Sequence, residues 1–105
     1  MAVIAMTQEM ATLGKDVALG LCEALGLSIT VAGKIAESSI SASNTLAVAC
    51  AAANVDWGLN LTHIYLAEDL VRNPIRMQQG LFARPTGPGN GVDVDEALVE
   101  RYRVR

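Results

Sequence analysis

The 105-residue sequence is poor in aromatic and charged residues. Aromatic residues make up 4% of the chain and charged residues 18%, whereas 51% of the residues are apolar, mainly Ala, Val, Leu and Ile. The mean hydropathy is +0.33. A chain of this length forms one small domain at most, and such a domain buries only roughly two-thirds of its unfolded surface. The composition therefore predicts exposed apolar patches that another structure covers.

Clusters of basic residues are also missing. The net charge of -3 argues against a nucleic-acid partner, which calls for a patch of Lys and Arg. The longest apolar-leaning stretch, 40–55, is shorter than the about 20 residues of a membrane span and is interrupted by Ser41, Ser43, Asn44 and Asn54. The first residues lack the basic start of a signal peptide. We therefore expect a cytoplasmic protein that does not insert into a membrane.

Few residues of this chain suit metal or nucleophilic chemistry. Cys22 and Cys50 lie on apolar helical stretches, and we expect both to be reduced and buried. His63 is the only histidine, and no Cys, His or carboxylate lies at ligand or triad spacing from it, which favours a structural role or a solvent-facing position. The glycines of 87–91 are not followed by the Lys of a phosphate loop, so nucleotide binding is not predicted.

The first two-thirds of the sequence alternates strand and helix patterns. Short apolar runs predict strands at 2–6, 28–32 and 55–61. Helical spacing predicts one helix that Thr12 caps and Gly26 ends, and a second over 44–53 that Ser43 or Asn44 caps. Strands separated by helices form parallel sheets, so we predict an α/β fold whose sheet has two exposed edges.

The last third of the sequence predicts short elements and turns. We expect a helical turn over 66–71, stopped by Asn73 and Pro74, and a hairpin over 75–84 around Gly80. The Pro- and Gly-rich segment 85–91 must be a loop, and Asp95 can cap a final helix that runs to Tyr102. We also expect Trp57 to be a packing anchor at the start of the third strand.

Two polar positions follow predicted strands. Glu37 comes after the second strand, in a serine-rich segment with Ser38 and Ser39, and Asn60 ends the third strand. The carboxyl ends of parallel barrel strands line active sites, so these residues are candidates for substrate binding. The serines can hold a carboxylate with hydroxyl and backbone donors at a helix start. Alternatively, Glu37 is a solvated acid near Lys34 and the serines are only a loop and a cap.

The order of several segments resembles the muconate-lactonising subgroup of the enolase superfamily, which includes mandelate racemase and muconate cycloisomerase. Residues 36–40 are similar to the end of the seventh barrel strand, 56–61 to the eighth strand, and 80–102 to the return into the capping domain. A barrel needs about 250 residues. The resemblance therefore implies the C-terminal fragment of a modified (β/α)8 TIM-type barrel. It divides the chain into the last strand–helix units (1–74) and a hairpin and helix that pack toward the capping domain (75–105).

The resemblance implies an isomerase or lyase, of cycloisomerase, epimerase or dehydratase type, that uses Mg2+ to abstract a proton α to a carboxylate. In the family the metal ligands and the Lys-x-Lys pair come from earlier strands, and a further lysine comes from the sixth strand. Here the matching segment 5–8 has no lysine, and Lys15 lies too far along the chain. We therefore expect no catalytic residue, bound Mg2+ or activity in this chain alone, although the full-length parent uses Mg2+.

For the parent, the resemblance implies a small carboxylate substrate. Glu37 and Asn60 are the predicted binding residues, with Ser38 and Ser39 behind them. Relatives place an acid near position 60, so Asn60 departs from the family and leaves the substrate open. The alternative is a non-catalytic interaction or oligomerisation protein, which binds a second copy of itself or a separate N-terminal barrel fragment. A truncated gene remnant is a further alternative.

Overall fold

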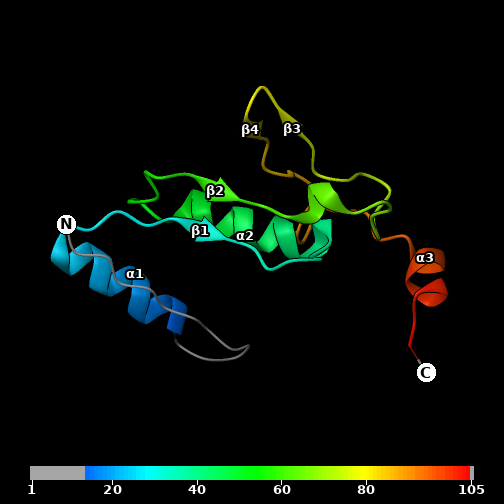
Figure 1. The fold of residues 1–105 in the computed structure, drawn as a ribbon, viewed down its shortest axis with the longest axis horizontal. Coiled ribbons are helices and arrows are strands. Elements are labelled where there is room, and N and C mark those ends of the chain that lie inside the picture. The colour runs from blue at the N-terminus through cyan, green and yellow to red at the C-terminus, as the bar shows by residue number, and fades with distance from the viewer. Residues whose placement is uncertain (1–13, 105) are drawn as a thin grey trace.

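Residues 14–104, which the computed structural model describes, form three α-helices, four short strands and one 3-10 helix (Figure 1). In chain order these are α1 (Gly14–Leu25), β1 (Val31–Ala32), α2 (Ser39–Ala51), β2 (Leu59–Asn60), the 3-10 helix η1 (His63–Tyr65), β3 (Met77–Gln78), β4 (Leu81–Phe82) and α3 (Glu96–Arg101). The predicted strand at 2–6, the cap at Thr12 and the segment 5–8 lie outside the described residues.

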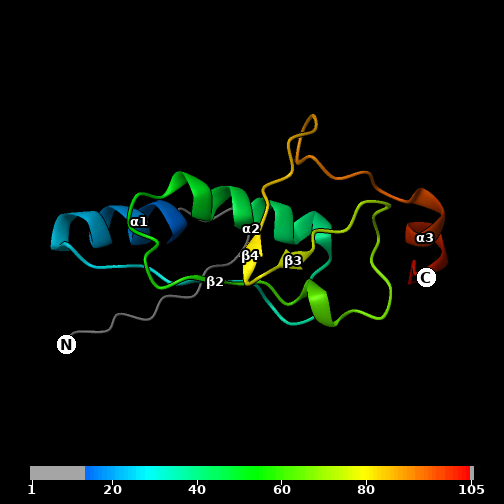
Figure 2. The ribbon, with the colours of Figure 1, turned by 90° about the horizontal axis from the view of Figure 1, so that it is seen from above.

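The centre of the molecule is a parallel pair of strands with helices beside it. β1 pairs with β2 in the register Val31 to Leu59 and Ala32 to Asn60. Figure 2 shows α1 and α2 on the same side of these strands. Both arrows in Figure 1 point toward the end of the molecule where α2 begins. The prediction of an α/β fold with parallel strands joined by a helix is confirmed.

The end of α1 was predicted by its glycine. Gly26 has a positive φ of 63°, a conformation that costs glycine little. The Gly26 N–H donates to the carbonyl of Glu23, and the Leu27 N–H donates to that of Cys22. These two bonds form a Schellman motif, which satisfies the last carbonyls of the helix.

The second predicted helix begins in the wrong place. We expected it over 44–53, but α2 begins at Ser39, after the N-cap Ser38. Hydroxyl and amide side chains disfavour helices because they compete for backbone groups. Here they bond within the helix, since Ser43 Oγ and Asn44 Nδ2 both donate to the carbonyl of Ile40. The serine-rich segment is therefore part of the helix rather than a loop before it.

The predicted helical turn over 66–71 is also wrong. The short helix η1 lies earlier, and the backbone of the predicted turn pairs with a segment far along the sequence. Val71 forms an antiparallel bridge with Val94, the Arg72 N–H donates to Asp93 O, and the Asp95 N–H donates to Leu70 O. Extended pairing with residues 93–95 replaces the local helical bonds, which is a tertiary effect that no local pattern reveals.

The hairpin and the last helix confirm the predictions made for them. β3 and β4 are antiparallel, and the turn residues Gln79 and Gly80 both have positive φ, as in the tight turns that match strand twist. Asp95 caps α3, because its carboxylate accepts the backbone N–H groups of Ala97 and Leu98.

The hydrophobic core is small. Among the described residues, the buried apolar side chains are Ala42, Leu46, Leu61, Val71 and Ile75. Trp57 is 66% exposed, so the prediction of a packing anchor is wrong. Cys50 is exposed and Cys22 half-buried, which contradicts the prediction of buried thiols. Within residues 14–104, no helix combines the length and the apolar character that crossing a membrane requires.

Candidate functional site

The candidate site is the rim formed by the carboxyl ends of β1 and β2. Because the strands are parallel, the residues that follow Ala32 and Asn60 lie side by side. The Gly33 N–H donates to Asn60 O at 2.8 Å, which extends the pairing by one residue. Asn60 itself is exposed. The rim therefore presents an amide side chain to solvent where the two strands end.

Glu37 is buried behind this rim. Its side chain and backbone together are only 8% exposed, so the alternative of a solvated loop acid is wrong. Its Oε1 accepts the Thr62 N–H at 3.2 Å, and its Oε2 accepts the Ser41 hydroxyl at 3.4 Å. Thr62 also donates its hydroxyl to the carbonyl of Lys34. Glu37 thus joins the loop after β1 to the loop after β2.

Ser38 and Ser39 differ in burial and in their hydrogen bonds. Ser38 is the half-buried N-cap of α2, and its side chain makes no capping hydrogen bond. Ser39 is fully buried. Its hydroxyl donates to Asp69 Oδ2 at 2.5 Å and accepts the Ile75 N–H at 3.0 Å. The structure therefore places the half-buried Ser38 at the rim, and the buried Glu37 and Ser39 behind it.

Two residues of this region were not singled out from the sequence. Thr62 supplies a backbone donor to Glu37, and Asp69 supplies a carboxylate to Ser39. The first lies only two positions after Asn60, so an examination of the strand end would have found it. Asp69 lies 30 positions from Ser39, and nothing in the local sequence links them.

His63 has a structural position, as one of the two interpretations predicted. It is 3% exposed, its Nε2 lies 2.6 Å from Ile75 O, and its ring lies 5.9 Å from that of Phe82. A carbonyl only accepts, so Nε2 carries the proton in the neutral ring. The other ring nitrogen, Nδ1, has no hydrogen-bond partner among the described residues.

The rim does not fit the Mg2+ ion that the family resemblance implies. In the part of the chain that the structure describes, no group of three or more Asp, Glu, His or Cys side chains is placed to hold a metal. Glu37 is the buried carboxylate of the rim, and both its oxygens already accept hydrogen bonds. Mg2+ needs six oxygen ligands in near-octahedral geometry. We therefore assign no metal-binding role to these residues.

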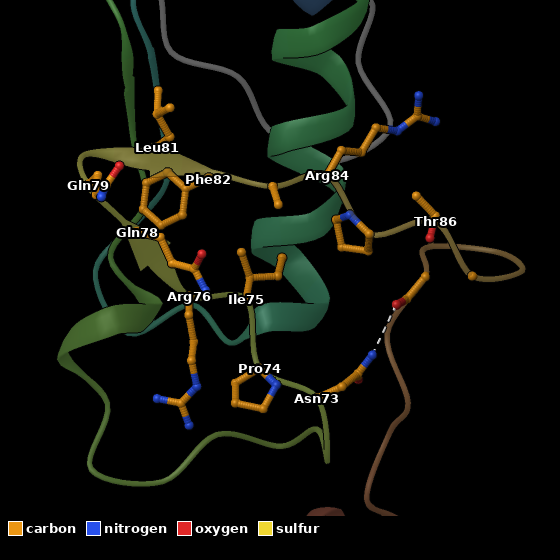
Figure 3. A pocket seen from close by; sticks show the side chains of 14 residues that line it. Asn73, Pro74, Ile75, Arg76, Gln78, Gln79, Leu81, Phe82, Arg84 and Thr86 are labelled. Atoms are coloured by element: carbon orange, nitrogen blue, oxygen red, sulfur yellow. Dashed lines mark hydrogen bonds between the residues drawn. The ribbon is translucent and has the colours of Figure 1, made fainter.

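A hollow lies between the hairpin and the Gly-rich loop, away from the rim. This open groove has a volume of about 950 Å3 and is lined by residues from 73 to 91 (Figure 3). Ile75 and Phe82 give it an apolar wall, and Asn73 Nδ2 donates to Gly91 O at one end. Figure 3 shows the guanidinium groups of Arg76 and Arg84 directed away from each other. The groove therefore lacks the converging charges of an anion site.

Comparisons with known proteins agree with this geometry. The description "Enolase C-terminal domain-like" belongs to the family model that matches residues 16–98. Crystal structures of 2-chloromuconate cycloisomerase from Rhodococcus opacus 1CP and of an isomerase from Streptomyces coelicolor A3(2) are each 27% identical to this chain. Their TM-scores are 0.75 and 0.74, over 83% and 85% of the chain. An enolase from Mycobacterium smegmatis, crystallised with formate and acetate, is 26% identical over 82% of the chain, with a TM-score of 0.69.

This chain accounts for only a part of those structures. It spans 24% of the Rhodococcus enzyme, 23% of the Streptomyces isomerase and 21% of the Mycobacterium enolase. Among curated proteins, no sequence matches it. The family match covers most of the chain, and the structural matches show that the chain corresponds to about a quarter or less of larger folds. The chain belongs to the enolase C-terminal domain-like family, and it corresponds to the C-terminal part of an enolase-superfamily fold of the muconate cycloisomerase type.

Proposed function

We propose that this chain supplies part of the substrate site of a Mg2+-dependent enolase-superfamily isomerase or lyase. The reaction is the abstraction of a proton α to the carboxylate of a small-molecule substrate, as in a cycloisomerase, epimerase or dehydratase. The observation that carries this proposal is the parallel pairing of β1 and β2, which brings Glu37 and Asn60 to one rim in a chain that matches the family. The metal ligands and the lysine bases belong to strands other than these.

Each rim residue has a distinct role in this proposal. The exposed Asn60 amide can donate and accept hydrogen bonds, so it contacts a neutral polar group of the substrate. Ser38 has a hydroxyl that is free of capping bonds and adds a second polar contact. Glu37 and Ser39 are buried, so they support the rim from behind and set its shape. We assign none of the four a role in proton transfer.

The proposal assigns the two parts of the chain to different parts of the enzyme. Residues 1–74 carry the strand–helix units of the barrel, and residues 75–105 carry the hairpin and helix that pack toward a capping domain. The chain alone is inactive, because positioned charges at the reacting atoms supply the main part of such catalysis. We also place the enzyme in the cytoplasm, since both cysteines are free thiols.

A chimera tests this function directly. Residues 16–98 replace the aligned segment of the Rhodococcus enzyme, and turnover of that enzyme's own substrate is measured with and without Mg2+. α-Proton exchange in heavy water is followed for a panel of small carboxylic acids. We expect Mg2+-dependent turnover or exchange in the chimera, a further loss in its Asn60→Ala variant, and none in the 105-residue chain alone. A folded, Mg2+-binding chimera without turnover or exchange contradicts the proposal, as does turnover by the chain alone.

One observation favours the second candidate, a non-catalytic interaction or oligomerisation protein. Large apolar side chains are exposed on several elements, including Ile35, Tyr65 and Leu81. Where such side chains join into one patch, they mark a binding face. Size-exclusion chromatography with light scattering separates the two candidates. A discrete oligomer favours the interaction protein, whereas a chain that stays monomeric or aggregates favours the separated part of a barrel enzyme.

A further inference from the structure

Helix α2 is capped by a carboxylate from a distant segment. Asp69, which lies between η1 and the bridge at Val71, accepts the backbone N–H of Ser39 at 3.0 Å to Oδ1 and 3.2 Å to Oδ2. Its Oδ2 also accepts the Ser39 hydroxyl at 2.5 Å, and its Oδ1 accepts the Leu70 N–H at 2.7 Å. The local N-cap residue, Ser38, makes no such bond.

The hydrogen bonds continue from this carboxylate into the base of the hairpin. Ser39 Oγ accepts the Ile75 N–H at 3.0 Å, and Ile75 O accepts the His63 Nε2–H at 2.6 Å. Ser39 is completely buried, so its hydroxyl has no water to bond instead. A continuous chain of bonds therefore runs from Asp69 through Ser39 and Ile75 to His63.

This arrangement gives Asp69 two effects on the rim. A negative charge at a helix N-terminus is favoured by the unpaired N–H groups and by the helix dipole, so Asp69 fixes where α2 begins. The Ser38 hydroxyl makes no capping bond of its own. Glu37 directly precedes this pair of serines, so the position of its carboxylate depends on the same helix start.

We propose that Asp69 is a positioning residue of the candidate site: it holds the buried Ser39 in place and thereby sets Ser38 at the rim and Glu37 behind it. The effect of Asp69 on substrate binding rests on the proposed function, whereas the capping contact can be tested without it. The position is encoded by two residues 30 apart, and a substrate does not need to touch Asp69 for the site to depend on it.

The test begins with the unaltered chain. In a 1H–15N spectrum, the amide protons of Ser39 and Leu70 should both lie downfield, because a carboxylate acceptor shifts a bonded amide proton downfield. In Asp69→Asn, that downfield shift should decrease, and the amide signals of Glu37 and Ser38 should shift. The matched control is Asp56→Ala, because Asp56 also accepts a serine hydroxyl, that of Ser28, but at an exposed position away from any helix start.

Chemical rescue gives the second measurement. Asp69→Gly should lower the midpoint of thermal unfolding by about 4–15 °C, as expected for the loss of a helix cap in a small domain. Sodium acetate or formate should restore part of that loss, relative to sodium chloride at equal ionic strength, since either anion can occupy the vacated capping position. The same salts should leave the unaltered chain and Asp56→Ala unchanged.

The two measurements can either support or disprove the positioning role of Asp69. Downfield amide protons of Ser39 and Leu70, together with rescue specific to Asp69→Gly, support the positioning role. If these two amide protons lack the downfield shift in the unaltered chain, the role is disproved, even if every variant fails to fold. Rescue that is absent, or equal in Asp56→Ala, also overturns it. An inactive chimera contradicts the proposed function and leaves this capping result standing, so the two failures are distinguishable.

Discussion

The carboxylate of Glu37 lies directly against the backbone of Gly33. A Cβ added at Gly33 would overlap the carboxylate carbon and both carboxylate oxygens of Glu37. This glycine is therefore required by close approach of another side chain, and no positive φ is involved. The contact lies where β1 ends, and the same carboxylate bonds to Thr62 beyond the end of β2. The spacing between the loop after β1 and the loop after β2 therefore depends on the absence of a side chain at Gly33.

Substitution of this glycine should act through Glu37. We expect Gly33→Ala to destabilise the chain by about 1–3 kcal/mol, because the carboxylate must leave its buried bonds to Thr62 and Ser41. In a Glu37→Ala background the same substitution should cost much less, with a coupling energy of about 0.5–3 kcal/mol. Urea unfolding of the four chains measures this cycle. If Gly33→Ala lowers the free energy of unfolding equally in both backgrounds, the overlap with Glu37 is not the reason that glycine is required at this position.

Removal of Glu37 should leave a backbone donor unpaired. We expect Glu37→Ala to cost about 1–3 kcal/mol, since the half-buried Thr62 N–H loses its acceptor. Glu37→Gln should cost less, because an amide oxygen still accepts. The Thr62 amide proton signal, which a carboxylate acceptor shifts downfield, reports the bond directly. Glu23→Ala, at an exposed acid of α1, is the control and should change stability by less than about 0.5 kcal/mol.

His63 should matter for stability as a hydrogen-bond donor. We expect His63→Ala to cost about 2–4 kcal/mol, because it opens a cavity beside Phe82 and leaves the carbonyl of Ile75 without its donor. His63→Gln restores a donor and should recover part of that loss. Tyr65→Ala, at an exposed position of the same short helix, should have little effect. Equal unfolding free energies for His63→Ala and Tyr65→Ala would contradict the buried hydrogen bond.

The last helix carries a pH-sensitive contact. The hydrogen bond from the Tyr102 hydroxyl to Glu68 raises the pKa of Tyr102 above 10.0, with a smaller contribution from desolvation, while nearby Arg101 acts to lower it. Because the folded pKa is the higher one, this contact stabilises the fold fully below about pH 10 and is lost as the pH rises through the folded value. Tyrosinate absorbance should therefore show the pKa of Tyr102 falling toward 10.0 in Glu68→Gln. An unchanged Tyr102 pKa in that variant would exclude the contact. Because the chain has two tyrosines, Tyr102→Phe shows which absorbance transition belongs to Tyr102.

The features that sequence predicted correctly are those whose cause lies within a few residues. Gly26 ends α1, Gly80 turns the hairpin and Asp95 caps α3, because each acts on neighbouring backbone groups. The start of α2 was missed because its cap, Asp69, lies 30 residues from Ser39. The segment around Val71 was misjudged because it pairs with Val94 rather than with itself.

The candidate site likewise has features that the sequence predicts and features that depend on tertiary contacts. The strand order brings the segments of Glu37 and Asn60 to the same end of the sheet, since parallel strands end together. The burial of Glu37 could not be predicted, because it depends on Thr62 from the other loop and on the space beside Gly33. Sequence thus indicates which residues reach the rim, whereas tertiary contacts decide which of them face a substrate.

The exposure of Trp57 has a practical consequence. The chain contains one tryptophan, and it lies at an exposed position between α2 and β2. Its fluorescence therefore comes from one known place on the surface. A partner that covers this position should shift the emission to shorter wavelength, because the indole would leave water for an apolar contact. The native chain consequently carries its own optical reporter for association, with no attached dye.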